Sequence, residues 1–205
     1  MSYKKREIFE KIIPYLDIPE TVVIHGSRQV GKTTLMKMLI NYLEKKNKKC
    51  FYLDLEMPRY LELCNQGHEE LIRYLELKTP SDIQKKEKLY VFIDEIQYLD
   101  NPSSFLKLLY DHHREKYKII VSGSSSFSIK SKFKDSLVGR IIDVEIFGLS
   151  FKEFLHFKDL SYSLDGSSEV ANQELNKLYL EYIKHGFYPQ VVLASNLELK
   201  QDFKT

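Results

Sequence analysis

The sequence has few of the features that mark secreted, disulfide-rich or membrane-spanning proteins. It holds two cysteines in 205 residues, Cys50 and Cys64, and their separation fits no metal-ligand motif. No stretch approaches the roughly 20 apolar residues that a membrane-spanning helix needs. The charged stretch from Met1 to Glu7 lacks the apolar region of a secretion signal. We therefore expect a cytoplasmic protein with reduced, buried thiols and no membrane span.

Net charge is also small. The chain carries 31 lysines and arginines against 29 aspartates and glutamates, which gives a formal net charge of +2 at pH 7. This balance neither requires nor excludes nucleic acid, because such binding depends on clustered charge. The best basic cluster, Lys130, Lys132 and Lys134 with Phe127 and Phe133, makes DNA contact a weakly supported alternative to a solubilising loop.

One stretch matches a phosphate-binding motif. Residues 26–33 read GSRQVGKT, which fits the P-loop pattern G-x-x-x-x-G-K-[ST]. The β-branched run before it predicts a buried strand over 21–25, and the apolar spacing after it predicts an amphipathic helix over 34–43. A strand before the loop and a helix after it favour a true P-loop over a chance match.

The residue types of this motif suit the binding of a nucleotide. Gly26 and Gly31 allow a tight turn and a close approach of the backbone to phosphate. The loop N–H groups and the helix N-terminus attract an anion. We expect Lys32 to reach the β- and γ-phosphates, and the Thr33 hydroxyl to bind Mg²⁺. The predicted nucleotide-binding residues of the loop are Gly26, Ser27, Arg28, Gln29, Val30, Gly31, Lys32, Thr33 and Thr34.

Strand and helix patterns alternate along the chain. This alternation predicts an α/β fold with a parallel sheet that helices cover on both faces. Ligands of such sheets bind at the carboxyl ends of the strands. The strands are predicted over 21–25, 50–55, 89–93, 118–121 and 141–146. The helices are predicted over 3–13, 34–43, 58–77 with a break near 65–67, 102–117, 151–157 and 174–184.

Polar residues follow two further strands of the predicted sheet. Asp94 and Glu95 end an apolar run, and Ser122 to Ser126 follow the next strand. Mg²⁺ accepts a carboxylate directly or through water, so we assign Asp94 to the metal together with Thr33. Glu95 is then the candidate base that polarises the attacking water. The alternative, a pair of solvated acids in a turn, is weakened by the presence of the P-loop.

In order, these stretches resemble the prokaryotic AAA-type ATPases of the AAA+ superfamily, and they are similar to its signal-transducing ATPases. The resemblance implies a three-layer P-loop NTPase with a parallel five-stranded sheet of order 5-1-4-3-2. It also implies a nucleotide-binding domain over 1–158 and a small helical lid over 169–205. The stretches that carry it are GSRQVGKT at 26–33, FIDEIQY at 92–98, SGSSS at 122–126, LVGR at 137–140, FGLSFKEFL at 147–155 and GFYPQVV at 186–192.

The same resemblance implies further site residues. Ser122 or Ser124 resembles the sensor that hydrogen-bonds the γ-phosphate or the attacking water, and the sequence leaves the choice open. Arg140 resembles the arginine that one subunit supplies to the ATP of its neighbour, which implies a homo-oligomer; the alternative is an arginine in a surface salt bridge. Pro189 resembles the lid proline that packs near the adenine. No arginine follows Arg140, so the lid arginine of many AAA+ proteins is missing.

The predicted function is hydrolysis of Mg²⁺-ATP to drive a conformational switch, with Lys32, Glu95, Arg140 and one of the two serines as catalytic residues. A nucleotide-gated binding switch, which holds ATP or ADP with little turnover, is an alternative that the missing lid arginine favours. A P-loop kinase for a small acceptor is a second alternative, and the Asp94–Glu95 pair argues against it. The resemblance further implies a nuclease-like C-terminal domain beyond residue 205.

Overall fold

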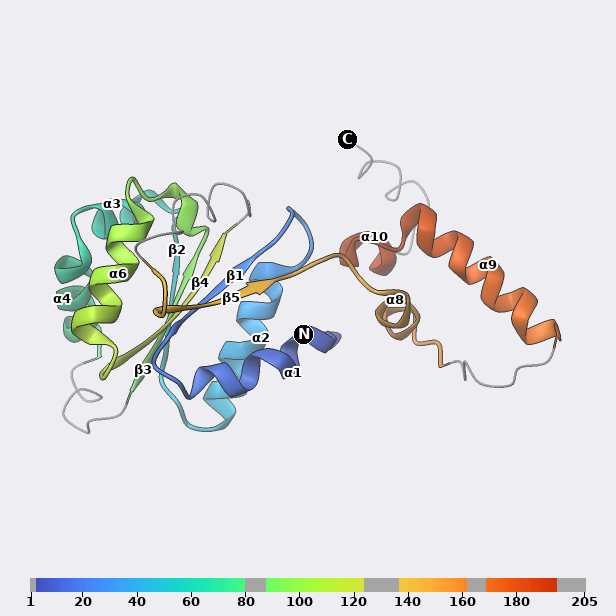
Figure 1. Ribbon diagram of the computed structural model, residues 1–205, viewed down its shortest axis with the longest axis horizontal. Coiled ribbons are helices and arrows are strands. Elements are labelled where there is room, and N and C mark those ends of the chain that lie inside the picture. Colours follow the sequence, from blue (N-terminus) through green and yellow to red (C-terminus); the bar gives the residue numbers. More distant parts are fainter. Residues whose placement is uncertain (1–2, 80–87, 124–136, 162–168, 195–205) are drawn as a thin grey trace. The chain divides into compact units, whose positions relative to one another are not determined.

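The computed structural model describes residues 3–79, 88–123, 137–161 and 169–194. Contacts within the chain divide it into two compact units. Figure 1 labels the helices and strands and colours the chain by position in the sequence. The larger unit comprises Ile8–Arg28 and Lys32–Ile146, and the smaller comprises Met1–Glu7, Gln29–Gly31 and Phe147–Thr205. Three residues of the P-loop therefore belong to the smaller unit. The expected domain limits at 158 and 169 remain predictions.

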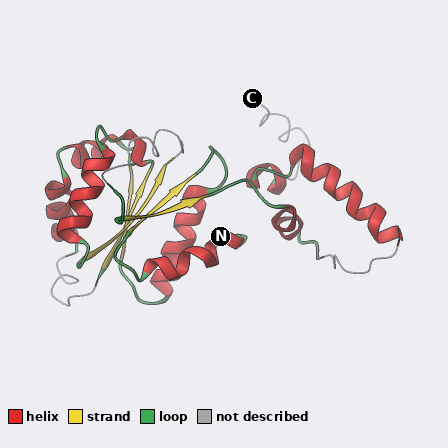
Figure 2. Cartoon of the chain, in the orientation of Figure 1, coloured by secondary structure: helices red, strands yellow, loops and turns green. Residues whose placement is uncertain are grey.

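A parallel five-stranded sheet lies in the larger unit (Figure 2). The strand order is β2-β3-β4-β1-β5, which is the predicted order 5-1-4-3-2 read from the other edge. Val121 of β4 lies opposite both Val23 of β1 and Ile93 of β3, so the carboxyl ends of these three strands meet at one edge. The strands are β1 (Thr21–His25), β2 (Cys50–Asp54), β3 (Leu89–Asp94), β4 (Tyr117–Gly123) and β5 (Ile141–Glu145).

Helices cover both faces of this sheet, as the alternating pattern predicts (Figure 1). On one face lie α1 (Glu7–Ile12), the short 3-10 helix η1 (Ile13–Leu16) and α2 (Lys32–Lys45). On the other lie α3 (Pro58–Asn65), α4 (His68–Lys78) and α6 (Pro102–His113). The break between α3 and α4 falls at Gln66–Gly67, inside the helical pattern that the sequence shows over 58–77.

The alternation of side chains decides which strand residues meet α2. Val91 and Ile93 of β3, and Ile119 and Val121 of β4, belong to the hydrophobic cluster that also contains residues of α4 and α6. Because successive side chains of a strand point to opposite faces, Asp94 and Ser122 lie on the other face, which α2 covers. The sheet therefore places two buried polar side chains on the side where the P-loop helix begins.

The structure corrects the ends of several predicted elements. The helix predicted over 102–117 ends at His113, because Tyr117 already pairs with Leu89 as the first residue of β4. β4 continues to Gly123, so Ser122 lies within the strand and not in a turn. The first helix begins at Glu7, four residues later than the pattern indicates.

Three helices form most of the described part of the smaller unit: α8 (Phe151–Phe157), α9 (Glu169–His185) and α10 (Pro189–Leu193). Ser150 and Glu153 form a capping box at the start of α8, since each side chain accepts from the backbone N–H of the other. Phe151 packs edge-on against Tyr179, with ring centroids 5.2 Å apart. α10 had no counterpart among the predicted helices.

No helix in the described ranges is both long and apolar enough to cross a membrane. Cys64 is buried and Cys50 is half-buried, and both are free thiols. Burial raises the pKa of each thiol to about 12, with a smaller contribution from Glu44 at Cys50. These thiols therefore stay protonated and unreactive at neutral pH.

A buried lysine joins β4 to the segment before β1. The Nζ of Lys118 donates to the carbonyl of Ile18 over 2.8 Å and to that of Glu20, and the residue is fully buried. Burial, and then the charge of Lys88, lowers the pKa of Lys118 to about 8, while Glu20 opposes the shift. Between pH 8 and about 10.5 the unfolded chain therefore holds a proton that the folded chain has lost.

We expect this lysine to make the protein more stable as pH rises through that window. The unfolding free energy should gain up to about 1.4 kcal/mol per pH unit from this group, because the unfolded state binds more protons there. Urea titrations of the parent and Lys118→Met at pH 7.5 to 10 will measure the slope. The variant should lack this part of the rise, and identical slopes would refute the assignment.

A glycine at the end of β1 allows β5 to pass close by. Gly26 has φ +151°, and a Cβ atom built on it would lie 2.1 Å from the carbonyl oxygen of Ile146. The Ile146 N–H donates to the His25 carbonyl over 2.7 Å, so the two backbone segments are held against each other. A side chain at residue 26 can be accommodated only if this backbone pairing moves.

We expect Gly26→Ala to be much more destabilising than Gly67→Ala. Gly67 also has a positive φ, +125°, but a Cβ built there meets no atom of the described residues within 4 Å. The Gly67 change should cost about 1 kcal/mol for backbone strain, and the Gly26 change roughly 1–3 kcal/mol more for the clash. Urea unfolding of both variants compares these costs, and equal losses would count against the close approach of β5.

Candidate nucleotide-binding site

The P-loop links β1 to α2 through residues in uncommon backbone conformations. Gln29 has φ 66° and Gly31 has φ 99°, both in the left-handed region that side chains other than glycine rarely adopt. Ser27, Arg28 and Gln29 are exposed, whereas the Val30 side chain is buried. The loop thus presents its polar residues to solvent and is anchored by one apolar side chain.

Lys32 is the first residue of α2 and points back under the loop. Its Nζ donates to the carbonyls of Gly26 over 3.0 Å and Ser27 over 2.8 Å, and the residue is only 5% exposed. Burial lowers the pKa of Lys32, and the charges of Glu95 and Asp94 oppose that shift. The predicted phosphate-binding lysine and the two predicted acids therefore share one electrostatic environment.

The remaining P-loop residues lie at the start of α2. Thr33 is half-buried and Thr34 is exposed, both within the first turn of the helix. No acidic residue occupies this turn, so the partial positive charge of the helix N-terminus is left for an anion. Within the smaller unit, a Cβ built on Gly31 would lie 3.8 Å from Cγ of Pro189, which places the predicted lid proline beside the loop.

Asp94 is held by two hydroxyl groups. Its Oδ2 accepts from the Tyr52 hydroxyl over 2.7 Å, and its Oδ1 accepts from the Ser122 hydroxyl. Burial, and then the bond to Asp94, raises the pKa of Tyr52, so the phenol stays a donor. These two bonds fix the direction of a carboxylate that is only 2% exposed.

Glu95 leaves the strand in a strained conformation. Its φ of 60° and ψ of 47° lie in the left-handed region, and β3 ends one residue earlier at Asp94. Its N–H donates to Ser122 Oγ over 3.2 Å, and its Oε2 accepts from the Gln97 side-chain amide. The chain then continues into η2 (Ile96–Tyr98). Because of this turn, the Glu95 side chain does not point in the direction that it would take if β3 continued.

Ser122 thus joins both predicted acids. Its hydroxyl donates to Asp94 and accepts from the backbone of Glu95, and the residue is fully buried. Because a hydroxyl has one proton, Ser122 cannot donate to a phosphate while it donates to Asp94. The other sensor candidate, Ser124, lies outside the described residues.

Arg140 lies at the amino ends of the strands, opposite the carboxyl ends where the P-loop begins. Its carbonyl accepts from the N–H of Thr21, the first residue of β1, whereas the P-loop follows the last residue of β1. The Arg140 side chain pairs with Asp111 of α6, with Nε to Oδ1 at 2.7 Å and Nη2 to Oδ2 at 3.2 Å. The structure therefore does not bring Arg140 to the P-loop of its own chain.

Sequence patterns did not identify Tyr52 or Gln97 as site residues. Tyr52 lies on β2, and its link to Asp94 requires β2 and β3 to be neighbours, as the pairing of Tyr52 with Phe92 shows. A period-2 reading of β2 places Tyr52 on the same face as Asp94 once that order is known. Gln97 offers no sequence signal of its own, because its contact depends on the left-handed turn at Glu95.

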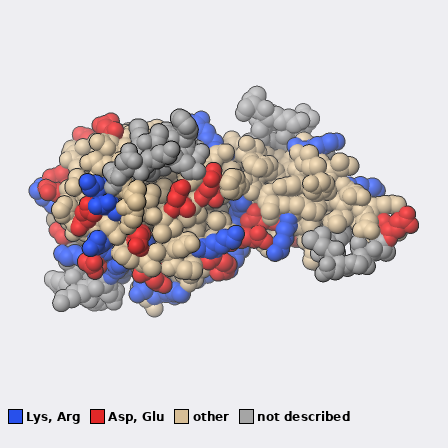
Figure 3. Space-filling model, viewed as in Figure 1, with Lys and Arg blue, Asp and Glu red and all other residues tan. Residues whose placement is uncertain are grey.

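Charged side chains of both signs are mixed on the face of the larger unit that Figure 3 shows. This face carries no broad patch of one sign over the described residues. The basic cluster around Lys132, which is the candidate DNA contact, lies outside the described residues. This face therefore adds no support for a nucleic-acid contact.

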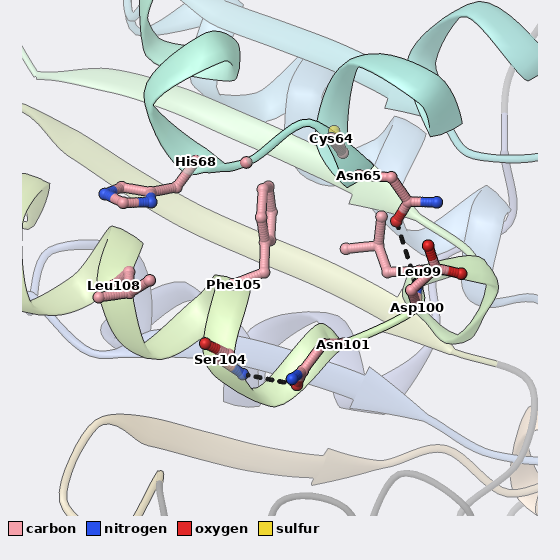
Figure 4. A pocket seen from close by; sticks show the side chains of 10 residues that line it. Cys64, Asn65, His68, Leu99, Asp100, Asn101, Ser104, Phe105 and Leu108 are labelled. Atoms are coloured by element: carbon pink, nitrogen blue, oxygen red, sulfur yellow. Dashed lines mark hydrogen bonds between the residues drawn. The ribbon is translucent and has the colours of Figure 1, made fainter.

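A separate pocket of about 180 Å³ lies between the α3–α4 junction and the start of α6 (Figure 4). Asn65 accepts from the Asp100 N–H over 3.2 Å at one side of it, and Asn101 caps α6 by accepting from the Ser104 N–H. The apolar wall includes Leu99 and Phe105. None of the predicted site residues lines this pocket.

Comparison with known proteins identifies the family. Residues 19–155, about two thirds of the chain, match the family model described as an AAA domain. An uncharacterized protein of Haemophilus influenzae is 31% identical over 196 residues, 93% of this chain and 44% of that protein. The uncharacterized protein MJ1544 of Methanocaldococcus jannaschii is 33% identical over 200 residues, 97% of this chain and 42% of that protein. The chain thus spans less than half the length of these relatives.

The fold has a counterpart among solved structures. The chain is similar to PCH-2 of C. elegans, with a TM-score of 0.55 and 15% identity, over 90% of this chain and 56% of that one. At this identity the similarity concerns the fold alone. The strand order, the P-loop and the match over residues 19–155 all indicate the same family. The chain therefore belongs to the AAA domain family and has the strand order and P-loop of the P-loop NTPase fold of the AAA+ superfamily.

Proposed function

We propose that the chain hydrolyses the β–γ phosphoanhydride bond of Mg²⁺-ATP and uses the reaction to change conformation. The observation that carries this proposal is the link of Asp94 to Glu95 through the single hydroxyl of Ser122. A hydrolase needs the carboxylate that polarises water to stand in a fixed relation to the metal site. The shared hydrogen-bond partner fixes the backbone of Glu95 relative to the Asp94 carboxylate, and the Gln97 amide holds the Glu95 carboxylate.

Lys32 is the cation of the proposed site. Its ammonium group is already bonded to the loop carbonyls of Gly26 and Ser27, so its position is set before any phosphate arrives. A preorganised charge stabilises developing negative charge without reorganising during the reaction. Glu95, restrained by its strained backbone and by Gln97, polarises the attacking water in this proposal.

The donor set fits Mg²⁺ that arrives with the nucleotide. Asp94 accepts two hydrogen bonds, and a carboxylate has about four lone-pair sites, so two remain for a metal or its water. No group of three or more His, Cys, Asp or Glu side chains in the described ranges can hold a metal. Mg²⁺ commonly needs only one or two carboxylates plus substrate phosphates, which suits Asp94 with the Thr33 hydroxyl. When bound, the ion neutralises charge on the phosphate oxygens.

A nucleotide-gated switch with little turnover is the second candidate function. The observation that favours it is the place of Arg140, at the amino end of β1 and bonded to Asp111. The four residue steps of β1 separate it from the P-loop by roughly 13 Å along the strand. At the amino ends of the strands Arg140 lies away from its own P-loop, so in this proposal it acts only on the nucleotide of a neighbouring subunit. In this second proposal the single chain binds ATP but hydrolyses little of it until a neighbouring subunit supplies its arginine.

We expect Lys32→Ala to abolish nucleotide binding, and Glu95→Gln to retain binding and lose hydrolysis. The first change removes the buried cation, and the second removes the proposed base but keeps the size of the side chain. Titration with a fluorescent ATP analogue and phosphate release measure the two effects. Lys37→Ala is the control, because Lys37 is an exposed lysine of the same helix. Hydrolysis by Glu95→Gln at the parent rate would refute the base assignment.

Turnover per chain should rise with protein concentration if Arg140 acts on the ATP of a neighbour. Arg140→Ala should remove that rise, by a factor of up to about 10³ at concentrations where the parent self-associates. Asp111→Asn breaks the same ion pair but keeps Arg140, so its turnover should equal or exceed that of the parent. Arg114→Ala, at an exposed arginine nearby, is the surface control.

The two ion-pair variants distinguish an arginine finger, which acts on the ATP of a neighbouring subunit, from an arginine with a structural role only. If Asp111→Asn loses turnover as much as Arg140→Ala does, the ion pair itself matters and the finger role is wrong. An unchanged rate for Arg140→Ala in a demonstrated oligomer would also exclude that role. Sedimentation at each concentration supplies the oligomeric state.

A further inference from the structure

Arg6, in the segment before α1, makes a dense set of side-chain hydrogen bonds within the smaller unit. Its Nε and Nη2 bind the two oxygens of Glu153 at 3.0 and 2.9 Å. Its Nη1 donates to the carbonyl of Val30 over 2.9 Å, and Nη2 donates to that of Gly148 over 3.0 Å. Both Nη atoms also reach the Phe147 carbonyl at 3.2 Å. The side chain is 11% exposed. ATP hydrolysis as proposed above does not use it.

Glu153 is fixed as firmly as Arg6. Its Oε1 also accepts from the Glu7 N–H over 3.0 Å, and its Oε2 accepts from the Ser150 N–H over 3.0 Å. Burial alone raises the pKa of this carboxyl, but the hydrogen bonds from Arg6 and Ser150 outweigh burial and lower the pKa. The carboxylate therefore stays charged at neutral pH and holds the guanidinium in one orientation.

The contact with Val30 reaches the nucleotide site. Val30 precedes Gly31 in the P-loop, and the carbonyl of one residue shares a planar trans peptide with the N–H of the next. In a trans peptide these two groups point in opposite directions. By holding the Val30 carbonyl on its own side, Arg6 turns the Gly31 N–H away from itself. In a P-loop, the backbone N–H groups of the loop donate hydrogen bonds to the phosphates.

We propose that Arg6 is a positioning residue for the P-loop, which it ties to the first turn of α8 and to the segment before α1. This inference rests on the proposed binding of Mg²⁺-ATP. A movement of the Val30–Gly31 peptide on nucleotide binding must either break its bond to Arg6 or move Arg6 and Glu153 together. Arg6 is thus the part through which the loop and the start of α8 respond to one another.

Lys4 provides a matched comparison in the same segment. Its Nζ donates to the Phe157 carbonyl over 2.9 Å and to Asp159 over 2.5 Å, at the other end of α8. Lys4 therefore holds the same segment to the same helix. Its hydrogen bonds involve the end of α8 and not the P-loop. A general loosening of the segment should appear in variants of both residues, and an effect on the loop in variants of Arg6 alone.

The test measures the affinity of the full chain for a fluorescent ATP analogue with Mg²⁺, alongside urea unfolding. We expect Arg6→Ala to weaken binding by on the order of tenfold or more, because a charge-assisted hydrogen bond to the loop is lost. Lys4→Ala should bind within about twofold of the parent at a comparable loss of stability. Arg6→Lys should remain weak, since one ammonium cannot reproduce the planar fork.

The outcomes separate this inference from the proposed function. A parent chain that binds no nucleotide overturns both. Normal binding by the parent with equal affinities for Arg6→Ala and Lys4→Ala overturns the positioning role alone. Full rescue by Arg6→Lys also overturns it, because charge without the fork would then suffice. If Arg6→Ala does not fold, Arg6→Lys against Lys4→Ala decides the matter by the same comparison.

Discussion

The register between β3 and β4 is the constraint on which the site depends. Ile93 lies opposite Val121, so the next residues of the two strands, Asp94 and Ser122, are neighbours at the carboxyl edge. A shift of one residue would turn every side chain of a strand to the other face and would send Asp94 into the hydrophobic cluster. The apolar residues of β3 and β4 therefore fix the register, and the hydroxyl of Ser122 makes use of it. The core and the polar site are specified by the same alternation.

Much of the fold follows from the sequence because its signals are local. Apolar runs and their spacing located the strands to within one or two residues, and the P-loop needed only its own eight residues. The strand order came from the resemblance to AAA+ ATPases, since no periodicity states which strands are neighbours. The end of α6 was misjudged because Tyr117 fits a helical pattern, and only its pairing with Leu89 assigns it to β4.

Two of the missed residues, Tyr52 and Arg6, have partners that are distant in sequence. Tyr52 meets Asp94 across 42 residues, and Arg6 meets Glu153 across 147. An arginine in a charged N-terminal stretch resembles any solvated cation, and no local pattern separates it from Lys4 or Lys5. The roles predicted for Arg140 and Pro189 came from matching motifs. The structure gives each a definite place without testing its chemistry.

The polar groups around the P-loop fall into two kinds, and the difference bears on which can respond to a nucleotide. Asp94 is held by two neutral hydroxyls, which can rotate and exchange partners when a cation or water arrives. Glu153 and Arg6 form a charged, bidentate pair in which both oxygens are occupied, and such a pair resists rearrangement. Hydrogen bonds at Asp94 can therefore be reorganised by an arriving ligand more readily than those of the charged pair. The hydrogen bonds at the carboxyl end of the sheet, around Asp94, are therefore the ones that can change partners. The Arg6–Glu153 pair at the start of α8 is the rigid contact.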